Sequence, residues 1–257
     1  MIEALVLSGL CKRFGAKIAV DRLSLTVPSG VLFGLVGPNG AGKTTTLSMA
    51  TGLLRPDYGT ANVLGHDVWT DPPAAKALIG VMPDGMRLFD RLSGRELLRY
   101  VGMLRRIDPG VIAARSRDLL DALALTEDAD MVVADYSAGM TKKISLACAL
   151  LHAPRLLILD EPFESVDPVS GEGIRDILRS YVASGGTVVL SSHVMELVET
   201  LCDGIGVIAQ GRVLAVGPTG QVCAGVPLQE RFLQLVGAPS GHTGGGLEWL
   251  RSSSGSS

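Results

Sequence analysis

The fold of this chain is decided by the stretch Gly37-Pro38-Asn39-Gly40-Ala41-Gly42-Lys43-Thr44-Thr45. It matches the pattern G-x-x-x-x-G-K-[ST] at every fixed position. The apolar residues 31–36 before it predict a buried strand, and residues 43–51 after it predict a helix. Glycines let the backbone turn tightly, and the helix N-terminus adds the positive end of its dipole. We therefore expect the loop to bind the phosphates of a nucleoside triphosphate. The alternative is a glycine-rich turn without a ligand.

Two side chains of this loop carry separate predicted roles. Lys43 can reach the terminal phosphate oxygens, and the Thr44 hydroxyl is placed to bind the Mg²⁺ that accompanies the nucleotide. The backbone N–H groups point toward the same phosphates. The residues predicted to bind the nucleotide here are Gly37, Pro38, Asn39, Gly40, Ala41, Gly42, Lys43, Thr44 and Thr45.

The size and composition of the chain exclude several classes of protein. Its 257 residues fit one large α/β domain. A net charge of −3 provides no broad basic field, so we expect no nucleic acid as a partner. The four cysteines are far apart and form no C-x-x-C pair, which argues against a metal site or a disulfide framework. No apolar run is long enough to span a bilayer, and the first residues lack a secretion signal, which predicts a cytoplasmic protein.

The first part of the chain predicts an antiparallel sheet. Alternating apolar residues at 4–7 and 23–27 predict two strands ahead of the phosphate-binding loop, and residues 60–64 predict a third. These strands form the N-terminal β-subdomain of one predicted domain over residues 1–236.

The rest of the chain predicts a mostly parallel sheet with an inserted helical subdomain. Helical spacing of leucines places that subdomain at about residues 85–152. Strand patterns return at 156–159 and 187–190, each after a helical stretch, which indicates a parallel sheet covered by helices. A hairpin follows at 205–216. Residues 237–257 are rich in Gly and Ser and predict a flexible tail. The fold class is therefore α/β.

A pair of carboxylates ends the predicted strand at 156–159. Asp160 and Glu161 follow the apolar run directly, as in a Walker B motif. Asp160 can hold Mg²⁺ through a water molecule, and Glu161 is placed to orient and deprotonate the attacking water. Alone, this motif is also compatible with a solvated acidic strand end. The phosphate-binding loop upstream favours the catalytic interpretation.

The pentapeptide Tyr136-Ser137-Ala138-Gly139-Met140 resembles the signature motif of ATP-binding cassette (ABC) ATPases, whose commonest form is LSGGQ. Ser137 and Gly139 match it, whereas Met140 cannot form the hydrogen bonds of a glutamine. In that family this serine and glycine bind the γ-phosphate of ATP held by the opposing subunit. The resemblance therefore implies a second ABC ATPase subunit, expected to be another copy of this chain. A plain serine helix cap is the alternative.

Further matches to the family occur in its usual order. Residues 164–167 resemble the D-loop, which places Asp167 near the dimer interface. His193 resembles the switch histidine that contacts the γ-phosphate, although a lone histidine is more often structural. Phe14 resembles the aromatic residue that stacks on adenine, and an ordinary core phenylalanine is the alternative. Val20 is also assigned to the nucleotide site. Lys43, Glu161 and His193 are the predicted catalytic residues.

One departure from the family pattern lies at Asp84. The family usually places a glutamine there, after Pro83. A carboxylate can still approach Mg²⁺ or its water, but it adds charge and loses the amide donor. We predict that Asp84 joins Thr44 and Asp160 around Mg²⁺ and transmits the nucleotide state to the helical subdomain.

The resemblance covers about residues 3–217. It implies an ATP-binding and ATP-hydrolysing subunit that dimerises on ATP and drives a separate transmembrane permease, on the inner face of the cell membrane. The variants at Asp84 and in the signature motif favour an exporter by analogy. The alternative is a soluble single-cassette ABC ATPase, for example in iron–sulfur cluster assembly. The transported substrate does not follow from the sequence.

Overall fold

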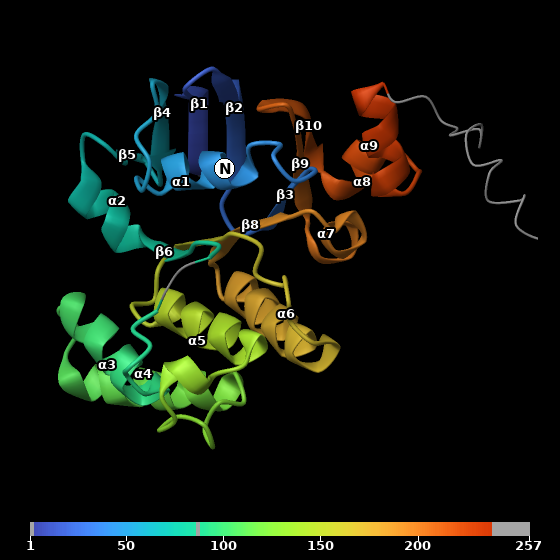
Figure 1. Cartoon of the computed structure of the whole chain (residues 1–257). Coiled ribbons are helices and arrows are strands. Elements are labelled where there is room, and N and C mark those ends of the chain that lie inside the picture. The colour runs from blue at the N-terminus through green and yellow to red at the C-terminus, as the bar shows by residue number, and fades with distance from the viewer. Residues whose placement is uncertain (1–2, 86–87, 238–257) are drawn as a thin grey trace, which may run out of the picture.

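The core of the protein is a six-stranded sheet, seen in a computed structural model that describes residues 3–85 and 88–237. Its strand order is β10-β9-β3-β8-β7-β6, and all neighbours run parallel except β10, which forms an antiparallel hairpin with β9 (Figure 1). This arrangement confirms the predicted mostly parallel sheet. The strands are β3 (Leu32–Val36), β6 (Ile79–Met82), β7 (Leu156–Leu159), β8 (Thr187–Ser192), β9 (Gly204–Ala209) and β10 (Arg212–Pro218).

A second, four-stranded antiparallel sheet confirms the predicted N-terminal β-subdomain. Its order is β2-β1-β4-β5, and Leu7 pairs with Leu25 in the buried part of the register. The first two strands extend further than predicted. The prediction stopped short because the outer ends of these strands carry exposed charged residues, where the apolar alternation stops. The strands are β1 (Glu3–Phe14), β2 (Lys17–Pro28), β4 (Tyr58–Val63) and β5 (His66–Asp67).

Hydrophobic cores cover both faces of the six-stranded sheet. On one face, Leu156 and Ile158 pack into a core shared with the antiparallel sheet and α1 (Lys43–Ala50). On the other face, Leu157 and Leu159 pack against the helices in the lower part of Figure 1. This double coverage explains why β7 is a continuous apolar run rather than an alternating one.

Helices α3, α4 and α5 occupy most of the stretch predicted as a helical subdomain, below the sheets in Figure 1. Several begin at side-chain caps, including a capping box between Ser93 and Glu96 at the start of α3. None of the described helices is long and apolar enough to cross a membrane. The helices beyond α1 are α2 (Pro72–Leu78), α3 (Gly94–Leu104), α4 (Pro109–Ala122), α5 (Ala138–Leu150), α6 (Pro168–Ala183), α7 (Met195–Leu201), α8 (Thr219–Cys223) and α9 (Leu228–Val236), with a 3₁₀ turn at Val133–Asp135.

Strand β6, directly before the predicted helical subdomain, was not predicted from the sequence. Its glycine shows why the strand fits there: a Cβ at Gly80 would lie 2.3 Å from the Ala149 carbonyl oxygen at the end of α5. The strand therefore depends on a close approach between segments far apart in the chain, and it carries Asp84 to the edge of the sheet. The predicted tail lies outside the described residues from 238 onward.

Candidate functional site

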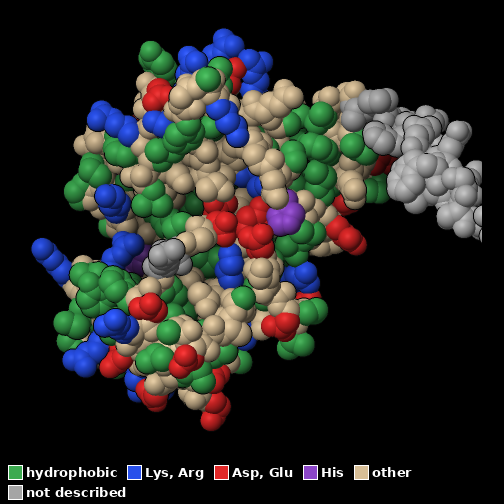
Figure 2. All heavy atoms as spheres, viewed as in Figure 1, with side chains coloured by type: hydrophobic (Ala, Val, Ile, Leu, Met, Phe, Trp, Pro, Cys, Tyr) green, Lys and Arg blue, Asp and Glu red, His purple; other side chains and the backbone are tan. Residues whose placement is uncertain are grey.

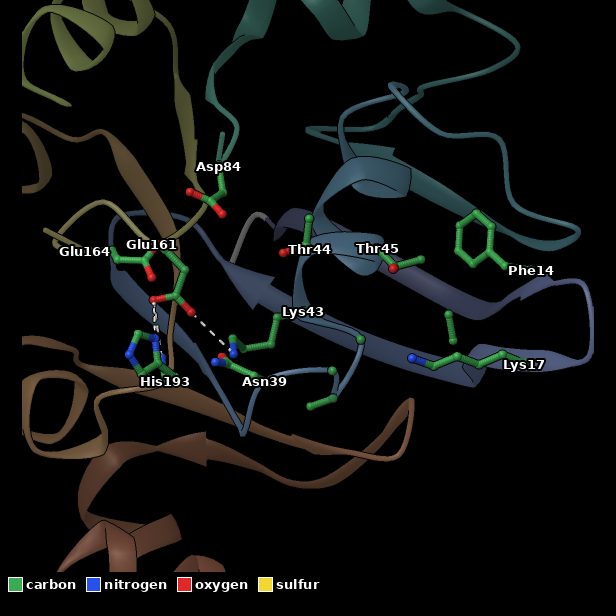
Figure 3. A pocket seen from close by; sticks show the side chains of 14 residues that line it. Phe14, Lys17, Asn39, Lys43, Thr44, Thr45, Asp84, Glu161, Glu164 and His193 are labelled. Atoms are coloured by element: carbon green, nitrogen blue, oxygen red, sulfur yellow. Dashed lines mark hydrogen bonds and ion pairs between the residues drawn. The ribbon is translucent and has the colours of Figure 1, made fainter. Parts of the chain in front are cut away.

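A cavity of about 490 Å³ lies where β3, β6, β7 and β8 end. The carboxyl ends of parallel strands are the usual place for ligands in open α/β sheets. Figure 2 shows acidic side chains and a histidine gathered between the sheets and the helices. The cavity brings together the predicted residues Phe14, Asn39, Gly40, Ala41, Gly42, Lys43, Thr44, Thr45, Asp84, Glu161 and His193, and adds Lys17, Ala19 and Glu164 (Figure 3). Of the other predicted residues, Val20, Gly37, Pro38, Ser137, Gly139, Asp160 and Asp167 do not line it.

The loop between β3 and α1 needs its glycines for close backbone approaches. A Cβ at Gly37 would lie 2.1 Å from the Ile208 carbonyl oxygen, and one at Gly42 would lie 2.6 Å from the Ala19 carbonyl oxygen. Gly42 also has a φ of 107°, which side-chain-bearing residues rarely adopt. The loop is thus fixed between β2 and β9, with the N-terminus of α1 facing the cavity.

The Lys43 ammonium is the centre of a buried charge network. Its Nζ donates a hydrogen bond to the Gly37 carbonyl oxygen at 2.8 Å and lies 3.3 Å from Glu161 Oε1. Only 6% of the Lys43 side chain and 11% of the Glu161 side chain are exposed. Buried charges need a partner of opposite sign, and here each provides it for the other. An arriving anion would compete with Glu161 for the same ammonium.

Glu161 is held through both its side chain and its backbone. Its Oε2 lies 3.0 Å from His193 Nδ1, at the end of β8. Its backbone N–H donates to Ser191 Oγ at 2.9 Å, and the same hydroxyl donates to Asp160 Oδ1. Ser191 therefore connects the Asp160 carboxylate to the backbone N–H of Glu161. Sequence reasoning did not assign it to the site, because its role depends on the pairing of β7 with β8.

The oxygen atoms near the loop fit Mg²⁺ by their chemistry. Thr44 and Asp84 line the cavity, and Figure 3 shows the Asp84 carboxylate directed toward the space between Glu161 and Thr44. Asp160 is 4% exposed and does not line the cavity. Within the described residues no group of three His, Cys, Asp or Glu side chains forms a metal cluster. Mg²⁺ prefers oxygen ligands, takes few from the protein and keeps several waters, which suits this set.

The far end of the cavity carries Phe14, at the end of β1. The residue is 51% exposed, which excludes the alternative of an ordinary core phenylalanine. Lys17 and Ala19, on the neighbouring β2, complete this wall. Val20 is fully buried in the core below, so its side chain lies behind the wall that Ala19 forms. Lys17 and Ala19 reach the cavity because β2 pairs with β1 in a hairpin. The apolar alternation of the sequence did not locate this pairing, so these two residues were not predicted for the site.

The signature residues lie on a different surface, at the start of α5. The Ser137 hydroxyl accepts a hydrogen bond from the Met140 N–H at 3.2 Å and so caps that helix. A Cβ at Gly139 would lie 3.4 Å from Asp167 Oδ2, so the starts of α5 and α6 are neighbours. Hydrogen bonds from Ser170 lower the pKa of Asp167, which caps α6 and remains ionised. These residues form no part of the cavity of their own chain.

The sequence is similar to ATP-binding proteins of transporters. It is 39% identical over 220 residues to the daunorubicin/doxorubicin resistance ATP-binding protein DrrA of Streptomyces peucetius, covering 86% of this chain and 67% of that protein. It is 38% identical to the linearmycin resistance ATP-binding protein LnrL of Bacillus subtilis, with coverage of 83% and 68%. It is 41% identical to a Nod factor export ATP-binding protein I of Sinorhizobium fredii, with coverage of 83% and 62%. The chain thus spans about two thirds of these relatives.

The fold is similar to that of solved ABC cassettes. The structure of an ATP-binding subunit of an ABC transporter superposes with a TM-score of 0.84 at 27% identity, covering 91% of this chain and 99% of that one. A nucleotide-free ATP-binding cassette superposes with a TM-score of 0.75 at 22% identity, which supports the fold alone. The family model for the ABC transporter matches residues 20–164. The chain therefore belongs to the ABC transporter family of ATP-binding cassettes, which bind and hydrolyse ATP.

Proposed function

We propose that this chain is the ATP-hydrolysing subunit of an ABC exporter. The observation that carries the proposal is the network of buried Lys43 and Glu161 with His193, beside a loop shaped for phosphates. The names of the relatives refer to drug resistance and to export, which supports an exporter over a role in iron–sulfur cluster assembly. In ABC transporters such subunits work with transmembrane partners. We place this chain in the cytoplasm, on the inner face of the membrane.

The residues around Lys43 divide the work of hydrolysis. Lys43 and the loop N–H groups bind the β- and γ-phosphates, and Phe14 stacks on the adenine ring. The incoming phosphate charge replaces Glu161 as the partner of Lys43, which frees the Glu161 carboxylate. Glu161 then accepts a proton from the water that attacks the γ-phosphorus, and ADP leaves. His193 holds Glu161 in place. Thr44, Asp84 and Asp160 would hold Mg²⁺, which neutralises phosphate charge when bound.

The second half of each ATP site is proposed to come from another copy of this chain. Ser137 and Gly139 lie outside the cavity, at a helix N-terminus suited to an anion. A homodimer would place them against the γ-phosphate held by the partner's loop, with Asp167 at the interface. ATP would close this dimer and hydrolysis would reopen it, which moves the transmembrane subunit.

Three measurements test this function. Purified wild-type protein should release phosphate from ATP, and Lys43→Ala should lose nucleotide affinity because the buried ammonium is gone. Epitope-tagged protein, purified from membranes of its own host, should carry a multi-spanning membrane protein in fixed ratio. Recovery with iron–sulfur assembly proteins instead, in membrane-free extract, would contradict the export function.

A further inference from the structure

Lys142, on α5, contacts two of the acidic residues that line the cavity, Glu161 and Asp84. Its Nζ donates a hydrogen bond to the backbone carbonyl oxygen of Glu161 at 2.9 Å and lies 3.3 Å from Asp84 Oδ1. Its side chain is 18% exposed, so the ammonium is largely enclosed by these partners. Both contacts are separate from the proposed binding of the partner's γ-phosphate by Ser137 and Gly139.

The backbone of Glu161 is in a conformation that needs support. Its φ is 48°, in the left-handed region, which is unfavourable for a residue that carries a side chain. Such a conformation persists when neighbouring groups fix it from several sides. Ser191 holds the N–H of Glu161 and Lys142 holds its carbonyl oxygen. The two bonds together direct the carboxylate toward Lys43 and the loop.

Asp84 gives the Lys142 contact a second function. The carboxylate follows β6 and faces the cavity, and its side chain is 40% exposed. Its charge compensates the ammonium, which would otherwise lose solvation without an opposite charge. Through Lys142, the loop after β6 and the turn after β7 are both attached to one helix.

We propose that Lys142 is a positioning residue that sets the direction of the Glu161 carboxylate and attaches Glu161 and Asp84 to α5. The inference rests on the proposed role of Glu161 as the base. Ser137 begins the same helix. When α5 shifts on contact with the partner's nucleotide, Lys142 shifts with it and changes the position of Glu161 in its own chain. Hydrolysis in one site thereby depends on the nucleotide contacted by the start of α5, about one turn before Lys142.

The test compares Lys142→Met with Lys143→Met. Lys143 is the next residue on α5 and is half-buried, and the structure gives it no ion pair or side-chain hydrogen bond within the described residues. A hydrogen bond from a charged donor is worth about 1.5 kcal/mol, which corresponds to about a tenfold change in rate. We expect Lys142→Met to lower kcat about tenfold and leave KM for ATP within about twofold, while Lys143→Met resembles wild type. Lys142→Arg should restore most of kcat because its guanidinium can donate to both oxygens.

Hydrogen exchange of the nucleotide-free protein gives a readout independent of catalysis. Backbone amides at 161–166 should exchange faster in Lys142→Met than in Lys143→Met, because the Glu161 carbonyl oxygen then keeps only the Glu164 N–H, at 3.3 Å, as a donor. Equal exchange and equal kcat in the two variants would overturn the inference about Lys142. The proposed function would still hold in that case, provided that the wild-type protein hydrolyses ATP. A rise in KM without a fall in kcat would also overturn it. A wild-type protein that does not hydrolyse ATP would instead remove the proposed function. If Lys142→Met does not fold, Lys142→Gln provides the same comparison.

Discussion

The cavity around Lys43 and the surface at the start of α5 differ in how much of a site one chain assembles. In the cavity, Lys43, Glu161 and His193 satisfy one another within the chain and are held by Ser191 and the loop backbone. At the start of α5, Ser137 is exposed and bonds only to its own helix among the contacts described. The first region forms a cavity for a ligand, and we propose that the second completes the site of another chain. The comparison supports a shared site between two copies.

The largest expected effect comes from removing the base in the cavity. Glu161→Gln keeps the size of the side chain but cannot accept the water proton, so kcat should fall about 10²–10⁴-fold while ATP still binds. Phosphate release and binding of a fluorescent ATP analogue separate the two effects. Glu172→Gln, on the exposed side of α6, is the matched control and should behave as wild type. If Glu161→Gln hydrolyses ATP at the wild-type rate, Glu161 is not the general base.

The next largest effect should come from the other region. Ser137→Arg places a long side chain where the partner's γ-phosphate is expected and removes hydrogen bonds to a charged group. We expect hydrolysis to fall about 100-fold, as for the loss of two such bonds. Nucleotide binding to the monomer should stay unchanged, because Ser137 does not line the cavity of its own chain. Ser184→Arg, at the exposed end of α6, controls for the added charge. A loss of affinity in the monomer would contradict the division into two halves.

The sequence predicts some features of these two regions and misses others. The phosphate-binding loop, the Walker B carboxylates and most strands of the two sheets follow from local patterns, because each depends on neighbours in the chain. Ser191, Lys142 and β6 depend on contacts between distant segments, so no local pattern reveals them. Val20 was predicted for the site, but the neighbouring Ala19 lines the cavity and Val20 is buried in the core. Successive side chains of a strand point to opposite faces, so a shift of one residue in the prediction selects the wrong face.

A smaller effect is expected at the adenine end of the cavity. Phe14→Ala should weaken ATP binding about fivefold, since an aromatic stack contributes about 1 kcal/mol, and kcat at saturation should stay the same. Ile18→Ala is a close control: Ile18 is also 51% exposed, on the adjacent strand, but does not line the cavity. Equal affinities for the two variants would remove Phe14 from the site.

The smallest effect on function is expected away from both regions, at His152. Burial, with Arg105 and Arg115 nearby, lowers the pKa of His152 to about 4. The unfolded chain binds a proton at an ordinary histidine pKa, so this residue costs stability as the pH falls from about 6.5 toward 4. His152→Gln should therefore lose less stability between pH 7 and pH 5 in urea unfolding and keep wild-type hydrolysis. Parallel losses in the two proteins would show that His152 is accessible to protons in the fold.

The central claim is that each chain holds one half of each ATP site. The most direct measurement is sedimentation of Glu161→Gln with ATP and Mg²⁺, beside the double variant Glu161→Gln/Ser137→Arg. We expect the single variant to be a monomer without nucleotide and a dimer with ATP. The double variant should bind ATP and remain a monomer. A double variant that still dimerises on ATP, or a single variant that never does, would contradict the shared site.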